Sequence, residues 1–383
     1  MKLLSIAGAR PQFVKAAVVS LAIERYNSSN PASGKIKQTL IHTGQHYEHN
    51  LSGVFFDQLP LPAPDYNLGI GSGSHGAQTA AMLEGLEKVI LEEKPDMTVV
   101  YGDTNSTIAG ALASAKLHVP VAHVEAGLRS FNRGMPEELN RVATDHLSDL
   151  LLCPTGTAVK NLRCEGIHRG VTMTGDVMLD AVKRFQPLAA RRAETLDRLR
   201  VESGGYVLVT IHRAENTDDL GRLENLLEML ARLRKPMVFP MHPRLRDCLA
   251  KREGGNELRR LLDGAPEIRI IEPVSYLDML LLEVNARMIL TDSGGVQKEA
   301  YFVGVPCLTL RDETEWTETL ANSWNRVVGT TTKEILPLVE SLWARNGLAP
   351  RGKPDLKQFG GGRAGDRTVR AIVAFLNKGA GKS

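Results

Sequence analysis

The chain has 383 residues, of which 43% are hydrophobic and 24% charged, with a formal net charge of +3 at pH 7. The length suits two domains, and the composition is ordinary for a soluble globular protein. The small net charge and scattered basic residues argue against a nucleic-acid partner. No apolar run is long enough for a membrane span. The four cysteines lack CxxC spacing and the amino-terminal apolar run is too short for a secretion signal. We therefore expect a cytoplasmic protein with reduced thiols and no membrane partner.

Short apolar runs alternate with longer helical patterns, which predicts parallel βαβ units and an α/β fold. In the first half we expect buried strands at Leu3–Ala7, Gln38–His42, Met97–Tyr101, Val119–Val124 and Leu150–Cys153. The second half restarts the pattern, with strands expected at Tyr206–Ile211, Met237–Met241, Ile268–Ile271, Met288–Leu290 and Pro306–Leu310. Most strands of the first half end in polar or glycine-rich residues, at the sheet edge where open α/β folds bind ligands.

The two halves predict two Rossmann-like domains facing a central cleft, the usual place for a small-molecule site. The segment Ala181–Ser203, rich in Arg, Ala and Leu, marks the region of the boundary, and charge-rich helices such as Arg222–Arg234 follow it. A Gly/Arg-rich loop at Phe359–Gly365 precedes an expected amphipathic helix at Thr368–Asn377.

A first candidate anion site joins the first strand to a helix, in the run Gly8-Ala9-Arg10-Pro11-Gln12-Phe13-Val14-Lys15. Pro11 suits the first helical position, and exposed N–H groups at a helix start favour an anion. Arg10 and Lys15 add positive charge there, so the run predicts a phosphate contact. The alternative is a tight turn with solvated bases.

A second candidate anion site is the run Asp292-Ser293-Gly294-Gly295, which follows a strand and opens a helix. Gly294 and Gly295 let the backbone approach a ligand, and Ser293 can donate to a phosphate oxygen. Glu299, about two turns along, can accept hydrogen bonds from ribose hydroxyls. The alternative is an N-cap serine in a glycine turn. Paired with the first site, the motif predicts a clamp for a nucleoside diphosphate.

Carboxylates concentrate at other strand ends and helix starts, with Asp103 in YGDT, Glu125 in HVEAGLR and Glu137 in MPEELNR. Acids that converge on one cleft suit general acid/base chemistry, because mutual repulsion separates their pKa values. The alternatives are a helix cap for Asp103, helix-dipole pairing for Glu137 and a solvated helix position for Glu138.

Two histidines also stand at strand ends. His212 closes the first strand of the second half beside Arg213, where it can protonate or stabilise a leaving phosphate. His242, in PMHPR, closes the next strand and is a second candidate. A structural histidine is the alternative for both.

Metal and cofactor signals are weak. His46 and His49 in QHYEH lie close together, but no partner cluster stands at a fixed spacing from them, so we expect no metal site. No GxGxxG follows a strand, which argues against a nicotinamide cofactor, and we expect no cofactor.

Taken in order, the motifs GARPQFVK, HTGQH, YGDTNST, HVEAGLRS, MPEELNR, TIHRAEN, HPR, DSGGVQKEA and RDETEW resemble, nearly end to end, the non-hydrolysing UDP-N-acetylglucosamine 2-epimerase family. The resemblance implies a GT-B-like fold and often a dimer, so we expect a homodimer. It places a first domain at residues 1–178, a second, UDP-binding domain at 179–363, and a terminal helix at 364–383 that returns to the first domain.

The resemblance also implies roles for individual residues. Asp103, Glu125 and Glu137 look like the essential acids, Arg141 like a supporting cation, and His212 like the residue that faces the diphosphate. The remaining residues look like contacts to the UDP-sugar: Arg10, Lys15, Arg129, Ser293, Gly294, Gly295 and Glu299.

Some positions vary within the family. Met279 stands where many members carry an aromatic residue near the uracil, and Trp316 replaces an arginine of some members. Gln45, Arg213 and His242 match residues of an allosteric UDP-sugar site found in some members. The segment Gly73–Gly76 lacks the Arg-Gln pair of several such proteins.

Within the family, the segments SFNRGMPEELNR, TIHRAENTDD and DSGGVQKEA most resemble those of the UDP-2,3-diacetamido-2,3-dideoxyglucuronate 2-epimerases of surface-polysaccharide synthesis. Lys298 replaces an acid that ordinary UDP-N-acetylglucosamine enzymes often carry. It and Arg133 are our candidates for binding a C6 carboxylate.

The expected reaction removes the C2 proton as UDP leaves C1, then returns the proton to the opposite face. Two faces need two positioned acid/base groups, in accord with several carboxylates. The alternatives are a UDP-N-acetylglucosamine 2-epimerase, a GT-B glycosyltransferase, a hydrolysing epimerase and an inactive UDP-sugar-binding regulator.

Overall fold

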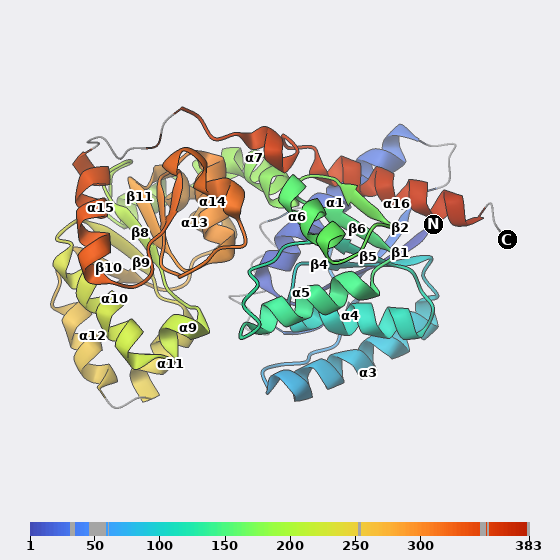
Figure 1. Cartoon of the computed structure of the whole chain (residues 1–383), viewed down its shortest axis with the longest axis horizontal. Helices are drawn as coiled ribbons and strands as arrows, with labels where there is room; N and C mark the ends of the chain where they lie inside the picture. The colour runs from blue at the N-terminus through green and yellow to red at the C-terminus, as the bar shows by residue number, and fades with distance from the viewer. Residues whose placement is uncertain are drawn as a thin grey trace. The chain divides into compact units, whose positions relative to one another are not determined.

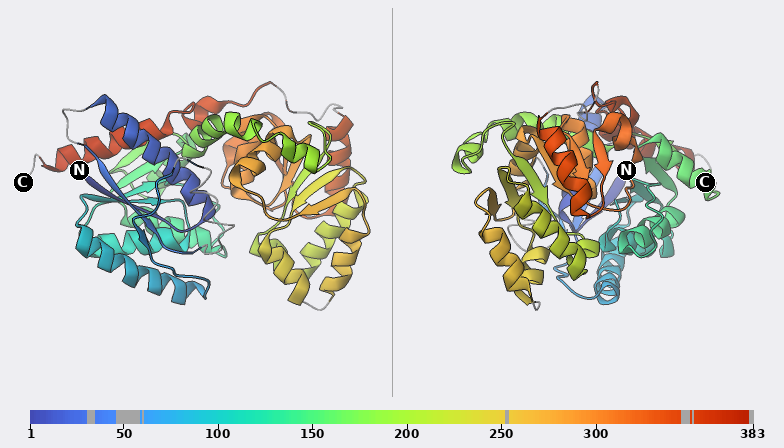
Figure 2. Two further views of the ribbon diagram at one scale, coloured as in Figure 1. Left: turned by 180° about the vertical axis from the view of Figure 1, so that it is seen from behind. Right: turned by 60° about the vertical axis from the view of Figure 1, so that its left-hand side comes forward.

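The computed structural model describes residues 1–30, 35–45, 59, 61–251, 254–344, 350 and 352–380. The chain forms two compact units, each built on a parallel sheet with helices on both faces (Figures 1 and 2). Unit 1 comprises Met1–Lys183 and Asp355–Ser383, and unit 2 comprises Arg184–Pro354. The chain passes into unit 2 within α7 (Val177–Ala190), slightly beyond the boundary expected after residue 178.

Within the described residues, unit 1 contains a seven-stranded sheet in the order β3-β2-β1-β4-β5-β6-β7. Its strands are β1 (Lys2–Ala7), β2 (Lys37–His42), β3 (Tyr66–Asn67), β4 (Met97–Tyr101), β5 (Val121–Val124), β6 (Leu150–Cys153) and β7 (Val171–Met173). The central strands β4, β5 and β6 are buried at every position. They consequently read as continuous apolar runs in the sequence.

The helices of unit 1 are α1 (Arg10–Ser29), α3 (His75–Glu93), α4 (Asn105–Lys116), α5 (Pro136–Leu147), α6 (Gly156–Cys164), the first part of α7, η2 (Leu356–Phe359) and α16 (Ala364–Ala380). The terminal helix α16 packs against α1. A Cβ on Gly365 would lie 3.0 Å from Val18, and Arg25 pairs with Asp366. The chain thus returns to unit 1 at its carboxyl end.

Unit 2 contains a six-stranded sheet, again within the described residues, in the order β10-β9-β8-β11-β12-β13. Its strands are β8 (Val207–Thr210), β9 (Met237–Pro240), β10 (Ile268–Ile271), β11 (Met288–Thr291), β12 (Cys307–Thr309) and β13 (Asn325–Val327). Its helices are α8 (Glu194–Arg198), α9 (Ala214–Thr217), α10 (Leu220–Arg232), α11 (Pro243–Lys251), α12 (Gly255–Asp263), α13 (Tyr276–Asn285), α14 (Gly294–Val303), η1 (Thr317–Ser323) and α15 (Thr332–Ala344).

Strand β8 shows how the core of unit 2 is divided. Val207 and Val209 belong to the cluster that also holds leucines of α10 and α15, whereas Leu208 belongs to the cluster under α13 and α14. Alternate residues of a strand point to opposite faces, so one short apolar run supplies both layers. None of the described helices is long and apolar enough to cross a bilayer.

Candidate functional site

The predicted acids of unit 1 stand at the carboxyl ends of neighbouring strands. Tyr101, the last residue of β4, is paired with Val124, the last residue of β5. Asp103 follows β4 after Gly102, and Glu125 follows β5 directly. Glu137 lies in the first turn of α5 and is half-buried. Parallel strands end at one edge of a sheet, so the fold itself brings Asp103 and Glu125 to the same edge.

Glu125 forms a buried ion pair with Lys15 of α1, with Lys15 Nζ 2.5 Å from Glu125 Oε1. Gly102 completes this packing: its φ is +63°, and a Cβ there would lie 3.0 Å from Lys15 Nζ. A side chain at this position would both strain the backbone and crowd the lysine. Lys15 was predicted to contact phosphate, and the structure directs its ammonium to the carboxylate of Glu125.

The backbone of Glu125 is itself unusual, with φ at +77°. Few residues other than glycine adopt this region, and doing so costs about 1 kcal/mol or more. The conformation is held by hydrogen bonds from the Glu125 and Ala126 N–H groups to Leu152 O. Strain of this kind concentrates at functional sites, which supports the prediction for Glu125.

Asp103 is bound by Arg141 of α5, whose Nη2 lies 2.5 Å from Asp103 Oδ2. The same guanidinium lies 3.2 Å from Glu138. Glu138 accepts hydrogen bonds from Ser130 and from the Phe131 N–H group. The interpretation of Glu138 as a solvated helix position is therefore wrong, because its carboxylate is buried and joins the preceding loop to Arg141.

The start of α1 differs from the expectation of open N–H groups. Gln12 Oε1 accepts hydrogen bonds from Gly8 N at 2.8 Å and Ala9 N at 3.0 Å. These two donors are thus used within the protein, and the expectation was wrong for them. Arg10 remains half-buried at the first position of the helix. Gln45 accepts hydrogen bonds from the backbone and hydroxyl of Ser106.

Arg129 also differs from its predicted role as a substrate contact. It is buried, and it donates through Nε and Nη2 to Glu165 and through Nη1 to Asp145 and Leu128 O. Because its guanidinium donates to these acceptors, Arg129 stabilises the interior of unit 1. Arg133, by contrast, is exposed on the loop before α5.

In unit 2, His212 follows β8 and is anchored by Asp292, which follows β11. Both carboxylate oxygens of Asp292 accept from the His212 N–H group, at 3.0 and 2.9 Å, and His212 Nδ1 lies 3.4 Å from Oδ1. Asp292 also accepts from Asn216 and from the Arg213 N–H group. His242 stacks on the His212 ring with centroids 5.0 Å apart.

The serine–glycine motif opens α14. Ser293 is its N-cap, accepting from Val296 N at 3.4 Å, so the capping alternative describes part of its role. A Cβ on Gly294 would lie 2.5 Å from Glu315 Oε1, so a side chain there would require the Glu315 carboxylate to move. Gly295 is exposed, and Glu299 is buried within the helix. Arg213 Nη2 lies 3.8 Å from Glu315.

Lys298 is buried beside an aromatic ring. It is 2% exposed, and its Nζ lies 3.7 Å from the centroid of the Trp316 ring. A cation over an aromatic face is stabilised by the ring quadrupole. Met279, expected near the uracil, packs partly buried against the core cluster under α13 and α14.

Sequence reasoning did not single out three residues that organise these sites: Asp292, His123 and Asp145. Asp292 opens the DSGG motif, and an aspartate after a buried strand was the available signal. His123 and Asp145 bond to each other at 2.7 Å inside unit 1. His123 lies on an apolar strand and Asp145 on an amphipathic helix, and neither pattern predicts that the two side chains bond to each other.

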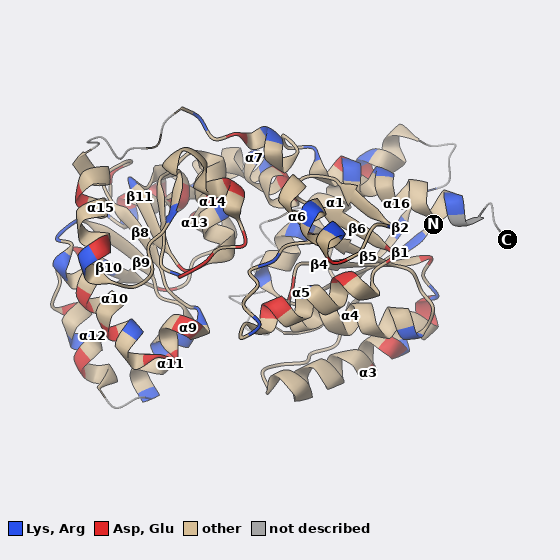
Figure 3. Cartoon of the chain, in the orientation of Figure 1, with Lys and Arg blue, Asp and Glu red and all other residues tan. Residues whose placement is uncertain are grey.

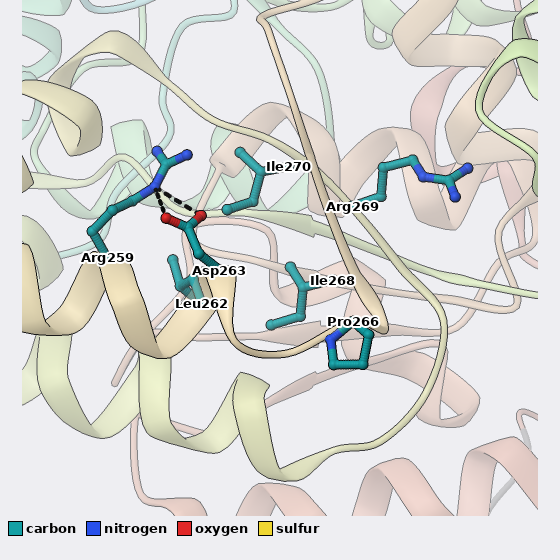
Figure 4. Close-up of a pocket in the computed structure, with 7 residues that line it drawn as sticks. All are labelled: Arg259, Leu262, Asp263, Pro266, Ile268, Arg269 and Ile270. Atoms are coloured by element: carbon teal, nitrogen blue, oxygen red, sulfur yellow. Dashed lines mark hydrogen bonds and ion pairs between the residues drawn. The ribbon is translucent and has the colours of Figure 1, made fainter.

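Neither overall charge nor the cavity beside β10 locates the site. Acidic and basic residues are interspersed along the helices of both units (Figure 3). A cavity of about 350 Å³ lies beside the edge strand β10, where Arg259 and Asp263 bond to each other and Arg269 points away from them (Figure 4). It is lined by none of the predicted site residues.

The metal-like run His46–His49 lies outside the described residues. Elsewhere in the described chain, no group of three or more His, Cys, Asp or Glu residues is placed to hold a metal ion.

Comparisons with known proteins agree with the motifs. The model of the UDP-N-acetylglucosamine 2-epimerase family matches residues 30–373. A "UDP-N-acetylglucosamine 2-epimerase homolog" of Methanococcus maripaludis is 50% identical over 337 residues, covering 88% of this chain and 91% of that protein. The UDP-2,3-diacetamido-2,3-dideoxy-D-glucuronate 2-epimerase of Pseudomonas aeruginosa is 47% identical over 379 residues, covering 97% and 99%.

Solved structures give the same result. The crystal structure of Methanocaldococcus jannaschii UDP-GlcNAc 2-epimerase in complex with UDP-GlcNAc and UDP is 43% identical, with a TM-score of 0.88, covering 98% of this chain and 100% of that one. The predicted α/β fold of two Rossmann-like domains of the GT-B type is confirmed, as is the resemblance stated from the sequence motifs.

Proposed function

Since this chain belongs to the UDP-N-acetylglucosamine 2-epimerase family and is therefore an isomerase of UDP-sugars, we propose that it converts UDP-2,3-diacetamido-2,3-dideoxy-D-glucuronate to its manno epimer. The similarity to the Pseudomonas aeruginosa enzyme, which extends over nearly the full length of both chains, carries the choice of substrate. UDP-N-acetylglucosamine is the second candidate, supported by the Methanocaldococcus jannaschii structure that holds it.

The two substrates differ at C6, where the glucuronate carries a carboxylate. Arg133 is the cation that we assign to it, because this side chain is exposed on the loop that leads to Glu137. Lys298, the other candidate from the sequence, packs on the Trp316 ring, so we assign it an indirect role in carboxylate binding rather than a direct contact. A charge-assisted hydrogen bond contributes about 1.5–3 kcal/mol, or roughly tenfold to a hundredfold in kcat/KM.

The chemistry follows from the weak acidity of the C2 proton, which is not adjacent to a carbonyl. In our proposal one carboxylate among Asp103, Glu125 and Glu137 takes this proton as the C1–O bond breaks. The electron pair of the C2–H bond forms a C1=C2 double bond, and UDP departs with the pair of the C1–O bond. A second acid protonates C2 from the opposite face, and UDP adds back to C1.

The electrostatics of the two units suit these separate tasks. Lys15 and Arg141 hold carboxylates of unit 1 in place through buried ion pairs. In unit 2, we assign stabilisation of the departing diphosphate to His212 and to the start of α14 at Ser293, and the contact of His212 with Asp292 supports this assignment.

The test is a parallel assay of the purified protein with each UDP-sugar alone, in deuterated solvent. We expect the manno epimer, deuterium at C2 and no acceptor requirement. An absence of label in the product would contradict the elimination mechanism, and accumulation of free UDP would indicate a hydrolysing enzyme.

The substrate choice is tested by the ratio of kcat/KM values in the same assay. We expect the diacetamidoglucuronate to be preferred by at least about tenfold. Arg133→Glu should narrow this ratio, and an analogue with a neutral C6 but the same 3-acetamido group is the control for the second acetamido group. Equal or better turnover of UDP-N-acetylglucosamine would reject the substrate and leave the epimerase assignment intact.

A further inference from the structure

The interior of unit 1 contains a sealed hydrogen-bond network centred on His123 of β5. Its Nδ1 lies 2.7 Å from Asp145 Oδ1, and its Nε2 lies 2.7 Å from the carbonyl oxygen of Gly102. Both His123 and Asp145 have side chains with no exposed surface. Neither side chain can touch a substrate, so any influence on the reaction passes through the groups that they hold.

His123 donates through both ring nitrogens. A backbone carbonyl only accepts, so Nε2 carries a hydrogen. Asp145 also accepts from Gly127 N at 3.0 Å and from Arg129 Nη1 at 2.7 Å. Burial alone raises the pKa of Asp145, but the hydrogen bonds and charges of His123 and Arg129 outweigh it, and the net shift is downward. The Asp145 carboxylate accepts from Nδ1, so both ring nitrogens of His123 are engaged in hydrogen bonds within the protein.

The partners of His123 lie beside each predicted acid. Gly102, whose carbonyl it binds, directly precedes Asp103. His123 itself stands two residues before Glu125 on β5. Asp145 lies on α5, the helix that begins at Pro136 and carries Glu137. One histidine therefore links the ends of β4 and β5 to the helix of the third acid.

Helix α5 makes two more contacts to the same turn. Asn140 Nδ2 donates to the carbonyl oxygen of Asp103 at 3.0 Å, and Arg141 binds the Asp103 carboxylate. The backbone on both sides of the Gly102–Asp103 bond and the Asp103 carboxylate are thus all held from α5, directly or through His123.

We propose that His123, through its bonds to Gly102 and Asp145, is a positioning residue that fixes Asp103 relative to Glu137 on α5. The inference rests on the proposed acid/base function of these residues. It concerns the distance between two reacting groups, for which a misplacement of about 1 Å can cost on the order of 10²-fold in rate.

Two variants separate the two bonds of His123. The amide nitrogen of asparagine reaches about as far as Nδ1, and that of glutamine about as far as Nε2. His123→Asn therefore keeps the bond to Asp145 and loses the bond to Gly102, whereas His123→Gln does the reverse. Each variant loses one buried hydrogen bond, so both should lower the melting temperature.

We expect both variants to lower kcat by about tenfold or more with KM unchanged, because each breaks one of the two bonds that link the Asp103 turn to α5. Assays run well below both melting temperatures, and calorimetry with UDP confirms an intact binding site. A wild-type kcat in either folded variant would overturn the proposal, because one bond alone would then be sufficient. His146→Asn and His146→Gln, at an exposed position of α5, are the matched controls and should leave kcat unchanged.

Asn140→Ala gives a second measurement if neither His123 variant folds, since Asn140 is only half-buried. It should lower kcat several-fold at constant KM, and an unchanged kcat would contradict the positioning of Asp103 from α5. Labelling of C2 by the wild-type enzyme is measured first. Its failure would count against the proposed function, whereas unaffected variants of an active enzyme would count against this inference alone.

Discussion

Each unit contains an aspartate–histidine pair, and the two pairs occupy different environments. In unit 1, His123 and Asp145 have side chains that are both 0% exposed, and each ring nitrogen of His123 meets an acceptor. In unit 2, Asp292 is equally buried, but the His212 side chain is 31% exposed. The same two residue types thus form a fully buried pair in unit 1, whereas in unit 2 a buried aspartate contacts a partly exposed imidazole.

Position along the strand explains the difference. His123 lies within β5, where side chains point to the layers above and below the sheet, and α5 supplies its carboxylate partner. His212 is the second residue beyond the end of β8, at the carboxyl edge where open α/β sheets bind ligands, and Asp292 directly follows the neighbouring strand β11. A histidine at a strand end is therefore a better functional candidate than one inside a strand.

The largest expected effects test the acid/base role that we propose for unit 1 against the binding role that we propose for unit 2. Asp103→Asn, Glu125→Gln and Glu137→Gln should each lower kcat by roughly 10²-fold or more, the usual scale for lost acid/base catalysis. UDP affinity should change little. Asp103→Asn and Glu125→Gln should also lower the melting temperature, because each takes an ionised partner from a buried cation, so these two variants are assayed well below their melting temperatures. Steady-state kinetics and calorimetry on each variant provide the check, and near-wild-type turnover in all three would remove these acids from the mechanism.

The fold could be predicted because its central strands are buried on both faces. Such strands appear as unbroken apolar runs, and Leu150–Cys153 was placed at its observed bounds. The strands that the sequence did not reveal are short ones at or near sheet edges: β3 (two residues), β7 and β13. Residues of β7 are partly exposed, so they lack the apolar signal of a buried strand.

The location of the site could be predicted better than its internal contacts. Motifs at strand ends placed Glu125 and His212 at the carboxyl edges of their sheets, because parallel topology fixes where those ends lie. Lys15 and Glu125 are 110 residues apart in the sequence, and only the packing of α1 against the sheet brings them together. Arg129 illustrates the same limit, since Asp145 lies on α5 and Glu165 caps the end of α6, and the strand pattern does not specify where these helices pack.

A smaller effect should follow when the orientation of His212 is disturbed. Asp292→Asn leaves a side chain of the same size that presents an amide hydrogen toward donors of His212, Arg213 or Asn216. We expect kcat to fall about tenfold to a hundredfold through misplacement of the imidazole. His212→Asn measures the full contribution of the ring. If Asp292 acts through His212, adding Asp292→Asn to that variant should lower kcat no further, and additive losses would contradict the coupling.

The smallest effect concerns the start of α14, where Ser293 has two possible tasks. Ser293→Ala removes the N-cap, which should destabilise the unit by about 1 kcal/mol. It also removes a donor to the diphosphate, which should weaken UDP binding by roughly fivefold for a hydrogen bond worth about 1 kcal/mol. Ser293→Asp separates these tasks, because aspartate caps a helix as well as serine does but repels a phosphate. We expect the Asp variant to keep the wild-type melting temperature and to bind UDP more weakly than the Ala variant, as measured by calorimetry. If UDP bound equally well to all three proteins, Ser293 would be a cap alone, and the diphosphate contact assigned to this helix start would be wrong.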